Sequence, residues 1–405
     1  MSPPALKRQV DLWRDQLPTV FPFYAIKCNP DPTILHALYD AGLDFDCASR
    51  RELLSIKELA RVNAARRIVY ANPCKSDRDI AYAKEMGSPM TVIDSIEELD
   101  KLKGYEGGAL ARIAVDDRGS KMPFSTKFGA SPKSIAAMSH LAKQDGLALH
   151  GISFHVGSSC LTGKAYWDAI HLAYESLAIL RRMGHPEAAT IDIGGGYLPC
   201  ESDFKEKAVY IRDAMIEINK QELTNGLPGI TFIAEPGRFF ATNTYDFYVQ
   251  VIGKKRSRGF WSYTIDDSIY GQFTSVLFDH AQPQWVRVQQ DGRPRNFSEG
   301  VLFGRTCDSV DVIARAEHME ELEVGDWLWF PGMGAYTRAT ASEFNGFPVP
   351  PIFMDTTSGQ DKILQFHSLR PKGVHYMPAV SAAEFWNKGV AEHFSKIDAI
   401  PPHWK

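Results

Sequence analysis

The sequence predicts an α/β fold: a (β/α)8 TIM-like barrel followed by a mostly antiparallel β domain. Two observations support this prediction. Short β-type runs alternate with helical stretches as far as about Phe240, and beyond it β-type runs follow one another with turns and few helical stretches. Alternating strands and helices are typical of parallel βαβ units, whereas consecutive strands joined by turns favour antiparallel pairing.

Eight β-type runs precede Phe240: Phe23–Ile26, Leu43–Cys47, Arg67–Asn72, Met90–Asp94, Ala111–Val115, Gly151–Val156, Thr190–Ile193 and Ile230–Glu235. After the fourth run, Ser95-Ile96-Glu97-Glu98 matches the capping box that starts a helix. Tyr166 to Met183 has the period of one long helix. Eight units fit a closed barrel. An open doubly wound sheet is the alternative, because strands three to five can be assigned in more than one way.

The second region contains five β-type runs: Tyr245–Ile252, Trp261–Ile265, Gln284–Val288, Val301–Phe303 and Trp327–Phe330. Ala382–Phe394 has a helical pattern. We therefore expect an N-terminal segment over residues 1–20 that packs on the β domain. A barrel over residues 21–240 and a β domain with a terminal helix over residues 241–405 would follow.

Composition narrows the class of protein. The chain has 405 residues, 23% of them charged, and a formal net charge of -4, which gives no reason to expect binding to nucleic acid or an anionic membrane. No apolar run approaches the roughly 20 residues of a membrane span, and the start MSPPALKRQVDLW lacks a secretory pattern. The cysteines form no CxxC pair, which favours free thiols in a reducing, cytoplasmic setting without a metal site: Cys28, Cys47, Cys74, Cys160, Cys200 and Cys307.

Polar residues gather where the predicted barrel strands end, and in such barrels the chemistry lies at the carboxyl ends of the strands. Lys27, Asp46, His155, Asp192 and Glu235 end strands one, two, six, seven and eight. Asp46 has an ordinary explanation as a helix cap, and Asp192 as a support for the loop that follows. A single histidine such as His155 is more often a hydrogen-bonded core residue than a catalyst.

Lys27 and Glu235 would share one mouth, because strands one and eight are neighbours in a closed barrel. A structural ion pair and a reactive pair both fit this placement. The glycines at 194–196, with Ser158 and Arg238, would offer hydrogen-bond donors to a phosphate. Pyridoxal phosphate (PLP) fits the combination, since a lysine amine can attach it and a carboxylate can keep its pyridine nitrogen protonated.

Ten blocks occur in order over roughly residues 20–350: PFYAIKCN (22–29), DFDCAS (44–49), KFGA (127–130), FHVGS (154–158), DIGGGY (192–197), AEPGRFF (234–240), YGQFTSVLFDHA (270–281), TCDSVD (306–311), GDWLWF (325–330) and MGAYTRATASEFNGF (333–347). Together they resemble eukaryotic ornithine decarboxylase, a member of the fold-type III (alanine racemase-like) PLP-dependent decarboxylases. Ten ordered blocks are far more specific than one motif.

The resemblance implies roles for residues of the predicted barrel. Lys27 would attach PLP, Glu235 would pair with the pyridine nitrogen, and His155 would stack on the ring. Asp46 would lie near Lys27. The cofactor phosphate would be held by Ser158, Gly194, Gly195, Gly196, Gly237, Arg238 and Tyr336.

The resemblance also implies that the active site is shared across a homodimer. Cys307 would return a proton to the α-carbon from the partner subunit. Asp279 and Asp308 would bind the distal ammonium of a diamino acid, Asp308 again across the dimer. Phe278 and Phe344 would line the site.

Three features depart from the family pattern. Only 21 residues precede Pro22, where the family has a longer segment. Met122-Pro123 stand where an arginine usually lies near the cofactor site. In the Cys307 loop, Arg305 replaces a proline and Ser309 a glycine. Arg305 would either face solvent or meet an extra carboxylate on a bulkier substrate, for which its planar guanidinium is suited.

Three functions follow from these residues. The first is PLP-dependent decarboxylation of a basic, ornithine-like L-amino acid to the amine and CO2, as in polyamine biosynthesis. The second is the same chemistry on a bulkier diamino or extra-carboxylate substrate in alkaloid or other specialised metabolism. The third is a catalytically inactive, antizyme-inhibitor-like binding protein. A racemase is disfavoured, because the position of its second base carries the Cys307 motif.

Overall fold

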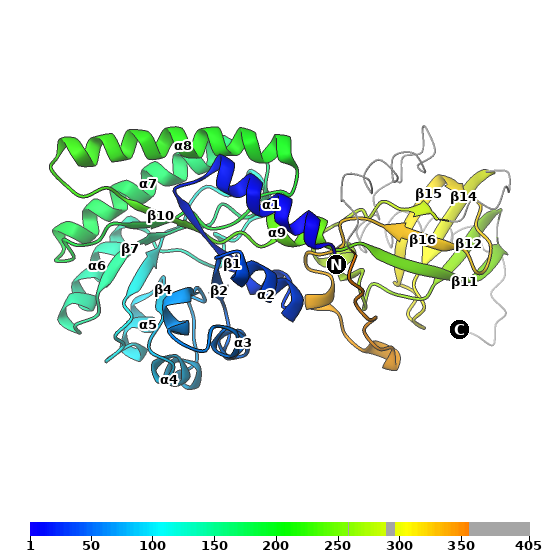
Figure 1. Cartoon of the computed structure of the whole chain (residues 1–405), viewed down its shortest axis with the longest axis horizontal. Coiled ribbons are helices and arrows are strands. Elements are labelled where there is room, and N and C mark those ends of the chain that lie inside the picture. Colours follow the sequence, from blue (N-terminus) through cyan, green and yellow to red (C-terminus); the bar gives the residue numbers. More distant parts are fainter. Residues whose placement is uncertain (258, 289–295, 356–405) are drawn as a thin grey trace, which may run out of the picture. The chain divides into compact units, whose positions relative to one another are not determined.

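The computed structural model describes residues 1–257, 259–288 and 296–355. Its internal contacts divide the chain into two compact units (Figure 1). Pro3–Asn243 form the barrel unit, and Met1–Ser2 join the described residues from Thr244 onward in the β unit. The terminal helix predicted over Ala382–Phe394 lies outside the described residues.

The barrel unit is a closed ring of parallel strands in the order β1-β10-β9-β7-β5-β4-β3-β2. The strands are β1 (Val20–Ala25), β2 (Asp44–Cys47), β3 (Ile68–Tyr70), β4 (Met90–Ile93), β5 (Ala109–Arg112), β7 (Leu149–Ser153), β9 (Thr190–Asp192) and β10 (Thr231–Ala234). Each of the eight predicted runs overlaps one of them, so the closed barrel is confirmed over the open sheet.

Strand register brings the predicted polar residues to one level of the barrel. The last residue of β1 lies opposite Asp46 in β2, and Ile233 of β10 lies opposite Asp192 in β9. Lys27 and Glu235 each follow two residues later along their own segments. Since β1 bonds to both β2 and β10, the ends of these strands form one continuous rim.

Helices cover the outside of the barrel, and the long neighbours α7 and α8 pack side by side (Figure 1). Asp31, Ser49, Ser76 and Ser131 accept hydrogen bonds from the first turns of four helices, which fixes where those helices begin. The helices are α2 (Pro32–Asp40), α3 (Arg50–Ala60), α4 (Asp77–Glu85), α5 (Ile96–Lys101), α6 (Pro132–Gln144), α7 (Gly163–Arg182), α8 (Glu201–Thr224) and the short α9 (Arg238–Ala241). α7 confirms the long helix predicted from Tyr166 to Met183.

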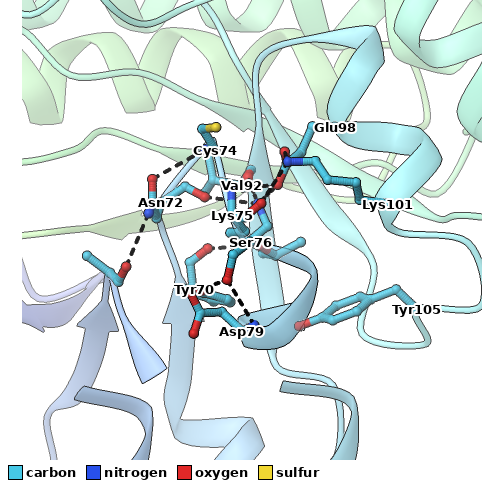
Figure 2. Close-up of polar contacts among 12 residues, drawn as sticks. Tyr70, Asn72, Cys74, Lys75, Ser76, Asp79, Val92, Glu98, Lys101 and Tyr105 are labelled. Atoms are coloured by element: carbon cyan, nitrogen blue, oxygen red, sulfur yellow. Dashed lines mark hydrogen bonds and ion pairs between the residues drawn. The ribbon is translucent and has the colours of Figure 1, made fainter. Parts of the chain in front are cut away.

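Helix α5 begins at Ile96, but the predicted capping box does not form, because Ser95 makes no side-chain cap. Glu98 instead accepts the backbone N–H of Lys75 at 3.0 Å, and its oxygens pair with Nζ of Lys75 and of Lys101 (Figure 2). The buried Lys75 ammonium also donates to two backbone carbonyls, at 2.9 Å each. A buried ammonium needs this full set of partners, so the tertiary contact takes Glu98 away from its local cap.

Helix α1 (Pro3–Gln16) belongs to the barrel unit. Its Trp13 is 1% exposed and packs on the rings of Phe204 and Phe239, while the Gln9 side chain donates to the Phe239 carbonyl oxygen at 2.7 Å. We expected residues 1–20 to pack on the β domain. For α1 that expectation is wrong, because its apolar face is buried against the barrel, and only Met1–Ser2 group with the β unit.

The β unit contains a six-stranded sheet in the order β13-β16-β11-β12-β14-β15, and all neighbours are antiparallel except β12 and β14. The mostly antiparallel domain is therefore confirmed. Strand β15 was not predicted, because its sequence VIARAEHME contains residues that favour helices. The elements are β11 (Phe247–Ser257), β12 (Phe260–Ile265), α10 (Thr274–Phe278), β13 (Val286–Arg287), β14 (Phe297–Phe303), β15 (Val312–Glu320) and β16 (Trp327–Phe330).

A small antiparallel pair lies beside the barrel strands: β6 (Ser120–Met122) with β8 (Ser158–Cys160). It joins the segment after β5 to the segment after β7, so Ser158 is held on a strand. Among the described helices, none combines the length and the apolar character that crossing a membrane requires.

Candidate active site

Lys27 lies in the single 3-10 turn Ile26–Cys28 that follows β1. Its Nζ pairs with Oδ2 of Asp46 at 2.5 Å; the Lys27 side chain is 43% exposed and that of Asp46 is fully buried. The other carboxylate oxygen of Asp46 is buried and has no hydrogen-bond partner among the described residues. The lysine amine is thus held by a buried carboxylate while its side chain stays partly exposed to solvent, a setting that suits a reactive amine.

Glu235 and Asp192 are buried carboxyl groups at the ends of β10 and β9. Burial, and then the neighbouring Asp192 carboxylate, raise the pKa of Glu235 well above its ordinary value. Asp192 accepts hydrogen bonds from the Gly194 N–H at 2.9 Å and the Ser153 hydroxyl at 3.2 Å. Because these bonds favour the charged form of Asp192, Glu235 is the member of the pair that holds a proton.

One oxygen of Glu235, Oε1, is buried and has no hydrogen-bond partner among the described residues. An unpaired buried carboxyl oxygen is costly to a folded protein unless a ligand supplies its partner. A ring nitrogen that shares a proton with the carboxyl group would do so, and the pyridine nitrogen of PLP has that property. The residues present therefore fit the cofactor.

His155 follows β7, and its ring is neutral. The Gly157 N–H donates to Nδ1 at 3.0 Å, which places the ring proton on Nε2. Burial, followed by the positive charges of Arg112 and Lys27, lowers the pKa of His155 well below its ordinary value. The edge of the Phe124 ring packs against the imidazole at a centroid distance of 4.9 Å. A neutral imidazole fixed in this way is suited to stacking on an aromatic cofactor.

The loop after β9 leaves room only for glycine. Gly194 and Gly196 have φ of +63° and +103°, values that side chains rarely adopt. A Cβ on Gly195 would lie 2.8 Å from the Glu235 carbonyl oxygen and 3.0 Å from Nε2 of His155. Within the part of the chain that the structure describes, the N–H groups of Gly195 and Gly196 have no acceptor.

Arg238 and Ser158 complete the same side of the barrel. Nη2 of Arg238 donates to the Ser158 hydroxyl at 3.3 Å, so both side chains meet beside the glycine loop. Gly237 has a different role, because a Cβ there would lie 2.8 Å from Cβ of Cys28. It lets the chain after β10 pass the turn that carries Lys27. Backbone donors, a hydroxyl and a guanidinium together can hold a phosphate group.

In the β unit the Cys307 loop lies beside the segment around Phe344. The exposed Cys307 donates its N–H to the Asn345 side chain at 3.1 Å. Asp308 accepts the Tyr270 hydroxyl at 2.5 Å, and the Tyr270 ring packs on Phe344 at a centroid distance of 4.4 Å. The Tyr270 hydrogen bond lowers the pKa of Asp308, which keeps this carboxylate ionised.

The sequence alone did not identify Tyr270 and Asn345 as functional residues. Both lie inside blocks that we had recognised, but no spacing pattern distinguishes them from their neighbours. Arg112 is the last residue of β5, and its positive charge acts to lower the pKa values of both His155 and Glu235.

The other residues predicted in the β unit lie in turns. Asp279 ends helix α10 directly after the exposed Phe278. Tyr336 has a positive φ of +54°, and its carbonyl oxygen accepts hydrogen bonds from Thr274 and Thr340.

Arg305 is half-buried and does not face open solvent. Its guanidinium carbon lies 4.1 Å from the centroid of the Phe347 ring, and its backbone N–H donates to the Asp267 carbonyl oxygen at 3.0 Å. Such stacking is typical of guanidinium groups.

Comparisons with known proteins agree with this geometry. The profile of the family described as pyridoxal-dependent decarboxylase, pyridoxal binding domain, matches residues 4–242. The chain is 37% identical over 348 residues to the chloroplastic ornithine decarboxylase of Nicotiana glauca, covering 84% of this chain and 78% of that protein. It is 36% identical over 353 residues to antizyme inhibitor 2 of Xenopus laevis, covering 83% of this chain and 76% of that protein. The solved arginine decarboxylase of Paramecium bursaria Chlorella virus bound to agmatine superimposes with a TM-score of 0.81 at 34% identity, over 87% of this chain and 94% of that one.

Proposed function

Because the chain belongs to the pyridoxal-dependent decarboxylase family, we propose that it converts a basic L-amino acid, ornithine above all, to the corresponding amine and CO2. The protein is a PLP-dependent decarboxylase of fold type III. One observation carries the catalytic part of the proposal. On one rim the amine of Lys27 lies 2.5 Å from the buried Asp46, beside a Glu235 carboxyl group that lacks a partner for one oxygen.

The barrel residues would bind the cofactor. When bound, PLP supplies the electron sink that accepts the electron pair left on the α-carbon as CO2 departs. Lys27 would hold PLP through its amine, Glu235 would keep the ring nitrogen protonated, and neutral His155 would stack on the ring. The phosphate would be held by Ser158, Gly194, Gly195, Gly196, Arg238 and Tyr336. Gly237 would let the segment that carries Arg238 pass close to the Lys27 turn.

The β unit would supply the substrate and proton contacts. Asp308, kept ionised by Tyr270, would bind the distal ammonium of the substrate together with Asp279. Cys307 would give a proton to the α-carbon, and Phe278 and Phe344 would line the pocket. We propose that Cys307 and Asp308 act in the partner subunit's site, so that the active form is a homodimer. The exposure of Cys307 supports this, since it leaves the thiol available to another chain.

The test is an absorbance spectrum of the purified protein together with CO2 release from a panel of amino acids. We expect a visible PLP band that disappears in Lys27→Ala, and CO2 from ornithine faster than from lysine or arginine. A PLP band without CO2 release from any of the three would overturn the proposed substrate while leaving the cofactor site intact.

A second substrate class is favoured by Arg305. The guanidinium lies next to the Cys307 loop in sequence, and its Nε is buried without a hydrogen-bond partner among the described residues. A diamino acid with a second carboxylate would supply that partner. Faster CO2 release from such a substrate than from ornithine would establish this alternative.

The similarity to antizyme inhibitor 2 of Xenopus laevis supports a third candidate, a binding protein without catalysis. Against it, the main residues to which the resemblance gives cofactor and proton roles are present: Lys27, His155, Glu235, Arg238 and Cys307. Purified protein that neither contains nor takes up PLP would favour the binding protein.

A further inference from the structure

Tyr166 supports the glycine loop from behind the proposed cofactor site. This α7 residue is completely buried, and its hydroxyl donates to the Gly195 carbonyl oxygen at 2.9 Å. Burial raises the pKa of Tyr166 well above its ordinary value, so the hydroxyl remains a donor at any physiological pH. The Tyr166 ring stacks on Tyr197 at 5.0 Å, and Trp13 of α1 meets Tyr197 edge-on at 5.2 Å.

The hydrogen bond to Gly195 determines where the next backbone N–H points. The described peptide bonds are all trans, and a planar trans peptide directs its C=O and its N–H to opposite sides. With the Gly195 oxygen turned back towards Tyr166, the Gly196 N–H is turned away from it. The Gly196 carbonyl is fixed separately, because it accepts the Cys160 N–H at 3.0 Å.

Both loop carbonyls are therefore bonded to protein, while the N–H groups of Gly195 and Gly196 have no acceptor in the described structure. Glycine alone does not fix this orientation, because a Gly-Gly peptide can rotate more freely than any other. If the orientation of this peptide were not fixed, ligand binding would have to order the loop, and this entropy cost would lower the affinity.

We propose that Tyr166 is a positioning residue for the cofactor phosphate: its hydroxyl orients the Gly195–Gly196 peptide so that the Gly196 N–H donates to the phosphate. The inference rests on the proposed phosphate site. Tyr166 then contributes to the binding of the phosphate group, and not to the binding of the pyridine ring or to catalysis.

The test compares PLP with pyridoxal, which has the same ring and aldehyde but no phosphate. Each is titrated into apoprotein of the wild type and of Tyr166→Phe, which removes the hydroxyl and keeps the buried ring. We expect Tyr166→Phe to weaken PLP binding about three- to tenfold, the range for one hydrogen bond, and to leave pyridoxal binding unchanged. The ratio of the two affinities does not depend on how much of the variant is folded.

Tyr197→Phe is the matched control. Tyr197 lies in the same aromatic stack and is equally buried, but its hydroxyl has no hydrogen-bond partner among the described residues. We expect its PLP-to-pyridoxal ratio to equal that of the wild type. The phosphorus NMR signal of bound PLP should shift in Tyr166→Phe and stay in place in Tyr197→Phe, because it reports on donors to the phosphate.

Two outcomes would overturn the inference. One is an unchanged ratio in Tyr166→Phe; the other is an equal fall in affinity for PLP and pyridoxal with a lower apoprotein melting temperature, which would indicate packing alone. Ser158→Ala separates this failure from failure of the phosphate site itself, because the Ser158 hydroxyl meets Arg238 at that site. If Ser158→Ala weakens PLP selectively and Tyr166→Phe does not, only the inference falls. If neither variant changes the ratio, the phosphate is not bound beside this loop.

Discussion

The barrel rim and the Cys307 loop of the β unit present their functional groups in opposite ways. On the rim, Asp46, Asp192 and Glu235 are buried at the ends of β2, β9 and β10, so regular structure fixes their positions. In the β unit, Cys307 is exposed, and its loop is held by two hydrogen bonds: the Cys307 N–H donates to the Asn345 side chain, and the Tyr270 hydroxyl donates to Asp308.

This contrast indicates a division of labour. Burial raises the pKa values of Asp192 and Glu235, which prepares this rim for one cofactor. The β-unit loop keeps an ionised carboxylate and a thiol accessible from outside the chain, as a surface that completes a second subunit's site would need.

The first prediction combines two variants, one without the barrel-rim lysine and one without the thiol of the β-unit loop. Lys27→Ala should lower CO2 release by about a thousandfold or more, and Cys307→Ala should also be nearly inactive. When the two proteins exchange subunits at equal amounts, half of the dimers are mixed and each has one complete site. About a quarter of the wild-type activity should return. No recovery under conditions in which subunit exchange is demonstrated by mass would contradict the shared site.

The second prediction concerns the proton on Glu235. Glu235→Gln should retain PLP but lower kcat about 100-fold, because a neutral amide cannot keep the ring nitrogen protonated. Activity and the absorbance of bound PLP measure the two effects separately. A variant with unchanged kcat would show that the unpaired Glu235 oxygen does not serve the cofactor.

The same residue predicts the pH dependence of apoprotein stability. Because the pKa of Glu235 is raised in the folded state, the folded chain binds more protons than the unfolded chain above the ordinary glutamate pKa of about 4.3. Stability from this group is present below that pH and is lost as pH rises through the folded value. Melting temperatures of wild type and Glu235→Gln should therefore converge at low pH and separate, with the variant higher, as pH rises.

The residues that can be predicted from the sequence differ between the barrel rim and the Cys307 loop in the same way. The strand ends could be predicted, because hydrophobic runs of the right length locate strands and barrel topology places their ends together. Tyr270 and Asn345 could not, since each bonds to a loop 38 residues away in the chain. Glu98 was misassigned for the same reason: Lys75, 23 residues earlier, outcompetes the local cap.

The fourth prediction concerns Tyr270. Tyr270→Phe keeps the ring on Phe344 but removes the donor to Asp308, so the pKa of Asp308 should rise. KM for ornithine should increase about three- to tenfold, the range for one hydrogen bond, with little change in kcat. The fall of kcat/KM on the acidic side of its pH profile should begin at a higher pH. Asp308 would be protonated at a higher pH in the variant, and a protonated carboxyl group binds the substrate ammonium weakly. The absorbance spectrum of bound PLP should not change. A changed spectrum would show that the Cys307 loop also affects the cofactor site on the barrel rim.

The smallest expected effect belongs to Arg305. If ornithine is the substrate, Arg305→Ala loses only the stacking on Phe347 and should change kcat/KM for ornithine by less than about threefold. Arg305→Lys is the control, because it keeps the charge and loses the planar fork. If a substrate with a second carboxylate is the natural one, both variants should lose at least about tenfold on that substrate, since a lysine cannot make the bidentate pair. A large loss on ornithine itself in both variants would contradict the small effect predicted here, and would show that Arg305 supports the geometry of the Cys307 loop through Phe347.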